Sequence, residues 1–287
     1  MQQLETISIE RQSHPDLSTE QPFSIVGEYC RGPRTEFHGD MHYALQICIV
    51  LTGGLEILFE DFQRVYGPGE MFFTMCWEPH AYRPLGKRNF FIAVNIDIDR
   101  IGTPDLFGDC DWLLPFTVEP ALRYCPETEK ERREVSSFGR HLCRLYRERP
   151  VFWRQEMWLA IHQLLLLAIR NTEAEEGAPP GIFVRIRPAL DLARKISSRP
   201  PELEQAAIAC ALSKSRFSEL FRLAMGVSFG KFAGRVRMAN ATRDLLEGQM
   251  TVEEIAERWG FSDASHFCHA FRAVYKCPPR EFRRRKG

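Results

Sequence analysis

Three histidines in the amino-terminal half of this 287-residue chain have the type and spacing for metal or ligand chemistry. His38 and His42 lie four positions apart, and His80 follows in a later run typical of strands. Imidazole is a common metal ligand, but histidines without a carboxylate partner form a weak metal-binding set. We therefore expect no metal and no cofactor. Two alternatives stay open: the histidines hydrogen-bond a small ligand, or they are structural.

Two aromatic residues, Trp77 and Tyr82, could stack on such a ligand, and with the histidines they complete the candidate ligand-binding set. The sequence has no nucleophile elbow, P-loop or dinucleotide fingerprint. Gly67-Pro68-Gly69 precedes a predicted strand and not a helix, so it does not form a phosphate cradle. The sequence therefore predicts a binding protein and not an enzyme.

A duplicated segment in the last hundred residues indicates a second kind of contact. SKSRFSELF at 213–221 matches DASHFCHAF at 263–271, with phenylalanines at equivalent positions 50 residues apart. Each segment follows a short predicted helix with a small residue at its centre, Ala207 or Ala256. A small residue allows a second helix to cross closely, as in a helix-turn-helix unit. The sequence therefore predicts two such units.

The second helix of each unit needs an N-cap, which Ser213 and Asp263 can provide. A long helix at about 230–246 connects the units and would place both second helices in successive major grooves of duplex DNA. A plain helical bundle would explain the phenylalanines but not the repeated caps, turns and small residues. The exposed positions give the candidate DNA contacts: Lys214, Ser215, Arg216, Ser218, Glu219, Arg222, Ala264, Ser265, His266, His269 and Arg272.

The charge distribution separates the two halves. Residues 1–180 carry 18 Lys and Arg against 27 Asp and Glu, a net charge of −9, whereas residues 181–287 carry 20 against 11, a net charge of +9. A basic half favours nucleic acid as its partner. The terminal Arg and Lys residues at 283–286 are expected to attract phosphates without reading sequence.

Periodicity and turn signals define the domain organisation. Short β-rich runs broken by Gly and Pro lie between 43 and 98, and helical spacing follows at 129–146 and 152–171. We predict an α+β protein with two domains. A β-barrel with trailing helices occupies 1–171, a linker occupies 172–182, and an all-α DNA-binding domain occupies 183–287.

Many residues at fixed spacings support the carboxy-terminal prediction: Ala207, Ser213, Phe217, Phe221, Gly226, Arg237, Ala241, Leu245, Leu246, Ile255, Ala256, Gly260–Asp263, Phe267, Phe271, Arg272, Pro279, Phe282 and Arg283. This pattern resembles the AraC/XylS family of bacterial transcription regulators. Ala211 and Lys276 depart from it, since the family usually has glycine there. The resemblance implies double-stranded DNA as a partner, a homodimer, and RNA polymerase as a further partner.

The amino-terminal strands and turns resemble the cupin-like sensor domain of that family, through His38, His42, Thr52–Gly54, Gly67–Glu70 and Pro79-His80. Metal cupins use an HxH pair followed by Glu, whereas this chain has His38-x-x-x-His42 followed by Gln46. The resemblance therefore implies a sensor of a small-molecule effector, for which a carbohydrate is one candidate. The alternative is a metal-dependent cupin enzyme fused to a DNA-binding domain.

Cysteine usage and hydropathy bear on the compartment and the oligomer. Nine cysteines occur without a CxxC pair, which is typical of a reducing compartment. The start of the chain is polar, and the most apolar stretch, 157–169, is too short to span a bilayer. We therefore expect a cytoplasmic protein. The helices at 129–146 and 152–171 are expected to dimerise, with packing against the barrel as the alternative.

Overall fold

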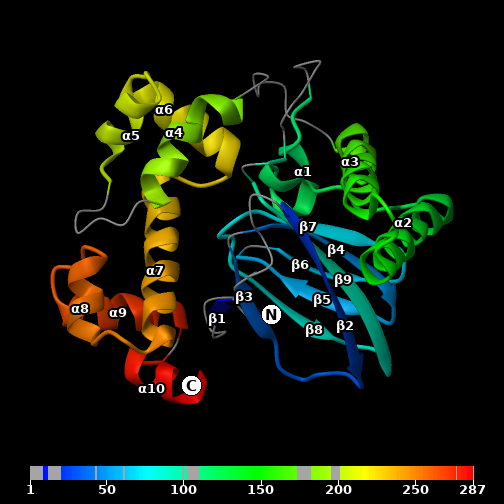
Figure 1. Ribbon diagram of the computed structural model, residues 1–287, viewed down its shortest axis with the longest axis horizontal. Helices are drawn as coiled ribbons and strands as arrows, with labels where there is room; N and C mark the ends of the chain where they lie inside the picture. The colour runs from blue at the N-terminus through cyan, green and yellow to red at the C-terminus, as the bar shows by residue number, and fades with distance from the viewer. Residues whose placement is uncertain are drawn as a thin grey trace. The chain divides into compact units, whose positions relative to one another are not determined.

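The computed structural model describes most of the chain as two compact units (Figure 1). The described residues are 9–11, 21–42, 44–60, 62–98, 100–101, 110–172, 182–194, 201–275 and 277–286. One unit is Gln12–Pro180, and the other is Gly181–Gly287 with Met1–Arg11, which includes strand β1 (Ile9–Arg11). The first unit contains the two sheets followed by helices, and the second is mainly helical, which confirms the predicted α+β class. The predicted linker, 172–182, lies outside the described residues except at its two ends.

The strands of the amino-terminal unit form two antiparallel sheets. Their bounds are β2 (Phe23–Arg31), β3 (His38–Met41), β4 (Leu45–Thr52), β5 (Leu55–Leu58), β6 (Gln63–Tyr66), β7 (Met71–Thr74), β8 (His80–Pro84) and β9 (Arg88–Ile96). Within this unit one sheet has the order β3-β8-β5-β6, and the other has the order β2-β9-β4-β7. Both orders are open among the described strands, so the structure does not confirm a closed barrel.

Strand β4 lies between β9 and β7 in its sheet, and both of its faces are buried. Cys48 and Val50 belong to the core between the sheets. Ile49 and Leu51 face the other way, toward helix α2 (Glu129–Glu148), where a Cβ on Gly139 would lie 3.0 Å from the Leu51 side chain. A strand that is buried on both faces needs apolar residues at consecutive positions, and this explains the unbroken apolar run in the sequence.

Two hairpins are joined through Asn89 at one end of the sheets. Its Oδ1 accepts hydrogen bonds from the backbone N–H groups of Gly54, at 3.2 Å, and Gly86, at 2.8 Å. Gly53 has φ 81°, and a Cβ there would lie 2.5 Å from the Arg88 carbonyl oxygen. Only glycine tolerates both the left-handed backbone and this close approach. The tight turn predicted at Thr52-Gly53-Gly54 is confirmed.

Helices follow the last strand. They are α1 (Leu114–Thr117), the 3₁₀ turn η2 (Pro120–Leu122), α2, and α3 (Trp153–Asn171). Helix α2 begins with a capping box, in which Thr128 accepts from the Glu131 N–H and the Glu131 side chain accepts from the Thr128 N–H. This motif satisfies backbone donors that the first turn leaves unpaired. None of the described helices is both long and apolar enough to cross a membrane.

From residue 182 onward, the described part of the carboxy-terminal unit is built from helices, as predicted. They are α4 (Ile182–Arg194), α5 (Leu203–Ala209), α6 (Lys214–Met225), α7 (Phe229–Glu247), α8 (Val252–Arg258), α9 (Ala264–Tyr275) and α10 (Pro279–Lys286). The connecting helix predicted at 230–246 is α7. Ala207 and Ala256 are each 1% exposed, in agreement with their predicted role where α5 and α8 meet the following helix.

The turns of the two units share one hydrogen-bond pattern. In the first, Ala211 N–H donates to Ile208 O and Leu212 N–H donates to Ala207 O, both at 2.9 Å. In the second, Gly260 and Phe261 donate to the carbonyls three and five positions earlier. Ala211 has φ 54° and Gly260 has φ 68°, so both lie in the left-handed region. The departure from glycine at Ala211 therefore retains the turn but adds strain.

This strain leads to a prediction about stability. An alanine in the left-handed region destabilises the folded state by about 1–2 kcal/mol, and glycine removes this strain. Glycine also raises the conformational entropy of the unfolded chain, which offsets about 0.4–1 kcal/mol of the gain. Ala211→Gly should therefore stabilise the carboxy-terminal unit by roughly 0.5–1 kcal/mol. Thermal unfolding of the full chain measures the change. Gly260→Ala is the matched control and should destabilise, so a loss of stability in Ala211→Gly would contradict the strain argument.

Candidate nucleic-acid interface and ligand cavity

Helix α6 separates a buried face from an exposed one. Phe217, Leu220 and Phe221 are buried in the unit's core. The Ser213 side chain accepts from the Arg216 N–H at 3.3 Å, so the predicted N-cap is confirmed. All candidate DNA contacts on this helix are exposed: Lys214, Ser215, Arg216, Ser218, Glu219 and Arg222. The helix therefore presents a continuous polar face at its amino-terminal end.

Three of these side chains already have ion-pair partners. Arg216 Nη1 lies 2.9 Å from Glu219 Oε2, and Lys214 Nζ lies 3.2 Å from Glu204 Oε1. Both pairs are solvent-exposed, and such pairs contribute little free energy. Glu219 can accept from cytosine N4 only after its pair with Arg216 rearranges.

Helix α9 repeats the arrangement of α6. Phe267, Phe271 and Tyr275 are buried, and Asp263 Oδ1 accepts from the His266 N–H at 2.7 Å, as the predicted cap requires. Of the candidate DNA contacts, Ala264 is half-buried, and the others are exposed: Ser265, His266, His269 and Arg272.

His266 is partly committed to the turn that precedes α9. Its ring lies edge-on to Phe261, with centroids 5.6 Å apart, and its Nδ1 lies 3.1 Å from Ser262 Oγ. These contacts hold the His266 side chain against the turn that precedes α9. Ser265 and His269 are exposed on the same helix.

Two arginines connect helix α7 with the second helix-turn-helix unit. Arg237 lies over the Phe261 ring at 4.3 Å and donates to the Gly260 carbonyl at 3.3 Å. Arg283 donates to the carbonyls of Leu245, at 2.8 Å, and Met250, at 2.6 Å. The expectation that Arg283 belongs to a phosphate-attracting tail is therefore wrong, because its guanidinium binds main-chain carbonyls at the end of α7.

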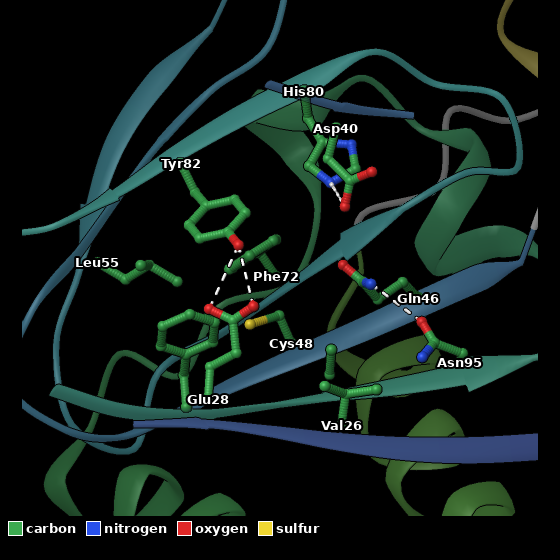
Figure 2. Close-up of a pocket in the computed structure, with 12 residues that line it drawn as sticks. Val26, Glu28, Asp40, Gln46, Cys48, Leu55, Phe72, His80, Tyr82 and Asn95 are labelled. Atoms are coloured by element: carbon green, nitrogen blue, oxygen red, sulfur yellow. Dashed lines mark hydrogen bonds and ion pairs between the residues drawn. The ribbon is translucent and has the colours of Figure 1, made fainter. Parts of the chain in front are cut away.

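The amino-terminal unit contains a cavity of about 30 Å³ between its sheets, which is room for a water or two. Figure 2 shows the side chains that surround it. The lining residues come from both sheets: Val26, Glu28, Asp40, Gln46, Cys48, Leu55, Phe72, His80, Tyr82, Phe91, Ala93 and Asn95. On one side, the Tyr82 hydroxyl donates to Glu28 Oε1 at 3.0 Å.

Asp40, His42 and His80 form a buried cluster at the polar end of the cavity. One potential ligand atom of each lies within 4.8 Å of the others. Burial lowers the pKa of His42 to about 4, and the hydrogen bonds that the imidazole makes to Ala44 and Gln46 act in the opposite direction. Burial also lowers the pKa of His80, and the Asp40 carboxylate only partly offsets it. Both imidazoles are therefore neutral near pH 7.

The structure separates the candidates named from the sequence. His80 and Tyr82 line the cavity, whereas His42 does not line it but belongs to the cluster with Asp40 and His80. His38 packs edge-on against Tyr82, with centroids 5.2 Å apart, but does not line the cavity, and neither does the buried Trp77. Sequence reasoning missed Asp40, although strand alternation places it on the same face as His42.

Comparison with known proteins supports the assignment of the carboxy-terminal unit. Residues 206–285 match the helix-turn-helix domain family. The regulatory protein PocR of Salmonella typhimurium is 36% identical over 81 residues, which cover 28% of this chain and 27% of that protein. The arabinose operon regulatory protein of Escherichia coli is 29% identical over 127 residues, 44% of each chain. The carboxy-terminal domain therefore belongs to the AraC/XylS family, as its motifs predicted.

The likeness over the remaining length is one of fold. The chain spans less than a third of the length of the first curated relatives that it matches. ToxT from Vibrio cholerae matches 91% of this chain and 97% of its own, with a TM-score of 0.58 at 11% identity. ToxT bound to (E)-4-(8-methylnaphthalen-1-yl)but-3-enoic acid has a TM-score of 0.56 at 10% identity, and the match covers 93% of this chain and all of that one.

Proposed function

We propose that the chain is a sequence-specific DNA-binding transcription regulator that acts in the cytoplasm and responds to a small-molecule effector. The observation that carries this proposal is the repeated presentation of α6 and α9. Each has a capped amino-terminal end, a buried aromatic stripe and an exposed polar face. A recognition helix contacts base edges with residues of its amino-terminal end. An electrophoretic shift of promoter DNA from the chain's own locus tests it, and the absence of a specific shift would overturn it.

Substitutions on α9 distinguish contacts to the DNA phosphates from contacts to the bases. Arg272→Ala should weaken binding to all sequences about equally, because a guanidinium near phosphate carries no sequence information. Ser265→Ala or His269→Ala should relax preference at one or two base positions, by about 1–3 kcal/mol each. Binding to a library of operator variants measures both effects. Arg170→Ala, an exposed arginine on α3, is the matched control. An equal, uniform loss in all three α9 variants would contradict the division.

The cavity supports a ligand with hydroxyl groups, such as a carbohydrate. Among the described residues that line it, Glu28 and Asp40 carry negative charge, Gln46 and Asn95 offer amides, and none is Lys or Arg. Without a bound cation, a carboxylate ligand such as the acid bound by ToxT would meet no opposite charge there. Ligand sites usually have volumes of about 300–1,000 Å³, so an effector must displace side chains in order to enter.

Ligand binding can control DNA affinity only if the effector binds one conformation better than another, and the coupling is then reciprocal. We expect a change of about 5- to 150-fold in operator affinity at saturating effector. Calorimetric titration with metabolites of the neighbouring genes would identify the ligand. The sensor role fails if a ligand binds yet changes neither operator affinity nor transcription.

A homodimer fits the exposed apolar residues around the start of α3. Val151, Phe152 and Leu159 are 78%, 71% and 64% exposed. Apolar side chains gathered in one region commonly mark an interface. Dimerisation would double the number of recognition helices on one operator, and RNA polymerase is then a further partner at the promoter. Sedimentation of wild type and Leu159→Glu tests the dimer.

A metal-dependent enzyme fused to the DNA-binding domain is the second candidate, and the Asp40, His42 and His80 cluster is the observation that favours it. The curated relatives are transcriptional regulators, which favours the sensor. Substrate turnover by the purified full chain would establish the enzyme.

A further inference from the structure

The cluster at the polar end of the cavity is created by strand pairing. Asp40 on β3 is the register partner of His80 on β8. Directly opposed residues of an antiparallel pair place their side chains on the same face, and a residue two positions along the chain shares that face. His42 stands two positions after Asp40. The backbone therefore directs all three side chains to one place between the sheets.

Main-chain carbonyls determine which imidazole nitrogen faces the cluster. His42 Nδ1 lies 2.9 Å from Ala44 O, and His80 Nδ1 lies 3.0 Å from Glu78 O. A carbonyl oxygen can only accept, so Nδ1 carries the proton in both rings. In a neutral imidazole that carries its proton on Nδ1, Nε2 presents a lone pair. Metal-binding histidines are usually oriented in this way, with the second ring nitrogen donating to a carbonyl or carboxylate.

Gln46 contributes a further oxygen. Its Nε2 donates to Asn95 Oδ1 at 3.0 Å, and Asn95 Nδ2 donates in turn to Ser24 Oγ at 3.3 Å. This chain of hydrogen bonds directs the Gln46 carbonyl oxygen away from Asn95 and toward Asp40, as Figure 2 shows. The cluster therefore has two imidazole nitrogens, a carboxylate and an amide oxygen.

A simple ion pair does not account for this arrangement. His80 Nε2 lies 3.9 Å from Asp40 Oδ2, which is too long for a hydrogen bond. The Asp40 and His80 side chains are only 4% and 2% exposed. A buried carboxylate between two imidazoles is a set of donor atoms that suits a bound cation.

We propose that Asp40, His42 and His80 bind a divalent transition-metal ion of the Zn²⁺ or Fe²⁺ type, with Gln46 oxygen as a further ligand. Two imidazoles and one carboxylate suit these ions and are too nitrogen-rich for Ca²⁺ or Mg²⁺. Zn²⁺ lies about 2.0–2.2 Å from nitrogen and oxygen ligands, so the ligand atoms must close to about 3–3.4 Å from one another. Binding of the ion therefore requires the side chains to rotate from their present positions, in which the ligand atoms lie within 4.8 Å of one another.

Titration of the full chain with Co²⁺ tests the site. Protein stripped with a chelator and dialysed should take up a single equivalent of Co²⁺ per chain, with visible ligand-field absorption that Zn²⁺ abolishes. Elemental analysis gives the stoichiometry after gel filtration. A wild-type chain that retains neither ion in stoichiometric amount would overturn the proposal.

Variants assign the ligands. Asp40→Asn and His80→Gln should each weaken Co²⁺ binding by roughly tenfold or more. Gln46→Glu should tighten it, because a carboxylate replaces an amide oxygen, and a folding defect cannot produce that gain. His38→Gln lies on the same strand outside the cluster and should bind as wild type does. Equal affinity in all four variants would overturn the assignment, as would a loss in His38→Gln as large as that in His80→Gln.

The operator shift of the same variants separates this proposal from the proposed function. If metal-free Asp40→Asn binds operator DNA, the proposed regulator function is supported whatever the result of the metal titration. Co²⁺ binding by a wild-type chain that binds no DNA would support the metal site and contradict the regulator.

Discussion

Arg123→Met is expected to destabilise the amino-terminal unit by about 3–5 kcal/mol, because it removes one partner of a buried ion pair. Arg123 donates to both carboxylate oxygens of Glu78, at 2.7 and 2.8 Å, and to the carbonyls of Phe73 and Val118. The two side chains are 5% and 18% exposed. Methionine fills the volume but leaves the Glu78 carboxylate and the carbonyls without this donor.

A double-mutant cycle separates the pair from simple loss of packing. Glu78→Gln should also destabilise, and Arg123→Met with Glu78→Gln should cost less than the sum of the single changes. Urea unfolding followed by tryptophan fluorescence measures the cycle, since four of the five tryptophans lie before residue 180. Arg147→Met, in an exposed pair with Glu148, is the control and should cost at most about 1 kcal/mol. Strict additivity of the Arg123 and Glu78 changes would contradict the coupling.

The same pair positions the loop that leads into the cluster of Asp40, His42 and His80. The Glu78 side chain accepts from the Met75 N–H at 2.9 Å, and its main-chain carbonyl accepts from His80 Nδ1. Loss of Arg123 frees this loop, so Arg123→Met should also weaken binding of Co²⁺ under conditions where the variant is folded. Arg123 acts here as a positioning residue.

Operator affinity is expected to fall by about 150-fold per bound chain between 50 and 200 mM salt. This value assumes four phosphate contacts, from the exposed cations Lys214, Arg216, Arg222 and Arg272. Each neutralised phosphate releases counterions, which gives a slope of about −3.6 in log affinity against log salt. Binding of the full chain to its operator at several salt concentrations measures the slope.

Single substitutions calibrate that slope. Arg272→Ala should reduce it by about 0.9, because one phosphate contact is lost. Ser265→Ala removes no charge and should leave it unchanged. Salt-insensitive binding would contradict a phosphate-dominated interface, and a slope unaffected by Arg272→Ala would remove Arg272 from it.

By itself, the sequence determined the architecture of the carboxy-terminal domain. The caps at Ser213 and Asp263, the small residues Ala207 and Ala256, and the connecting helix are where their patterns predict. The reason is that these signals act over a few residues, since a cap bonds to a position three residues away and a helical stripe repeats every turn. Arg283 was assigned wrongly, because its carbonyl partners lie 33 and 38 residues away in the chain.

Only the tertiary structure decided the amino-terminal site. Strand runs and glycine turns predicted the sheets, but which residues meet between them depends on register, and a shift of one residue reverses every side chain. From the sequence alone, His38 and His42 are grouped as candidates because both are histidines at close spacing. The pairing of β3 with β8 instead opposes Asp40 to His80, 40 positions later, and adds the carboxylate that the histidines lacked. That contact is set by hydrogen bonds between distant strands, and no local pattern encodes it.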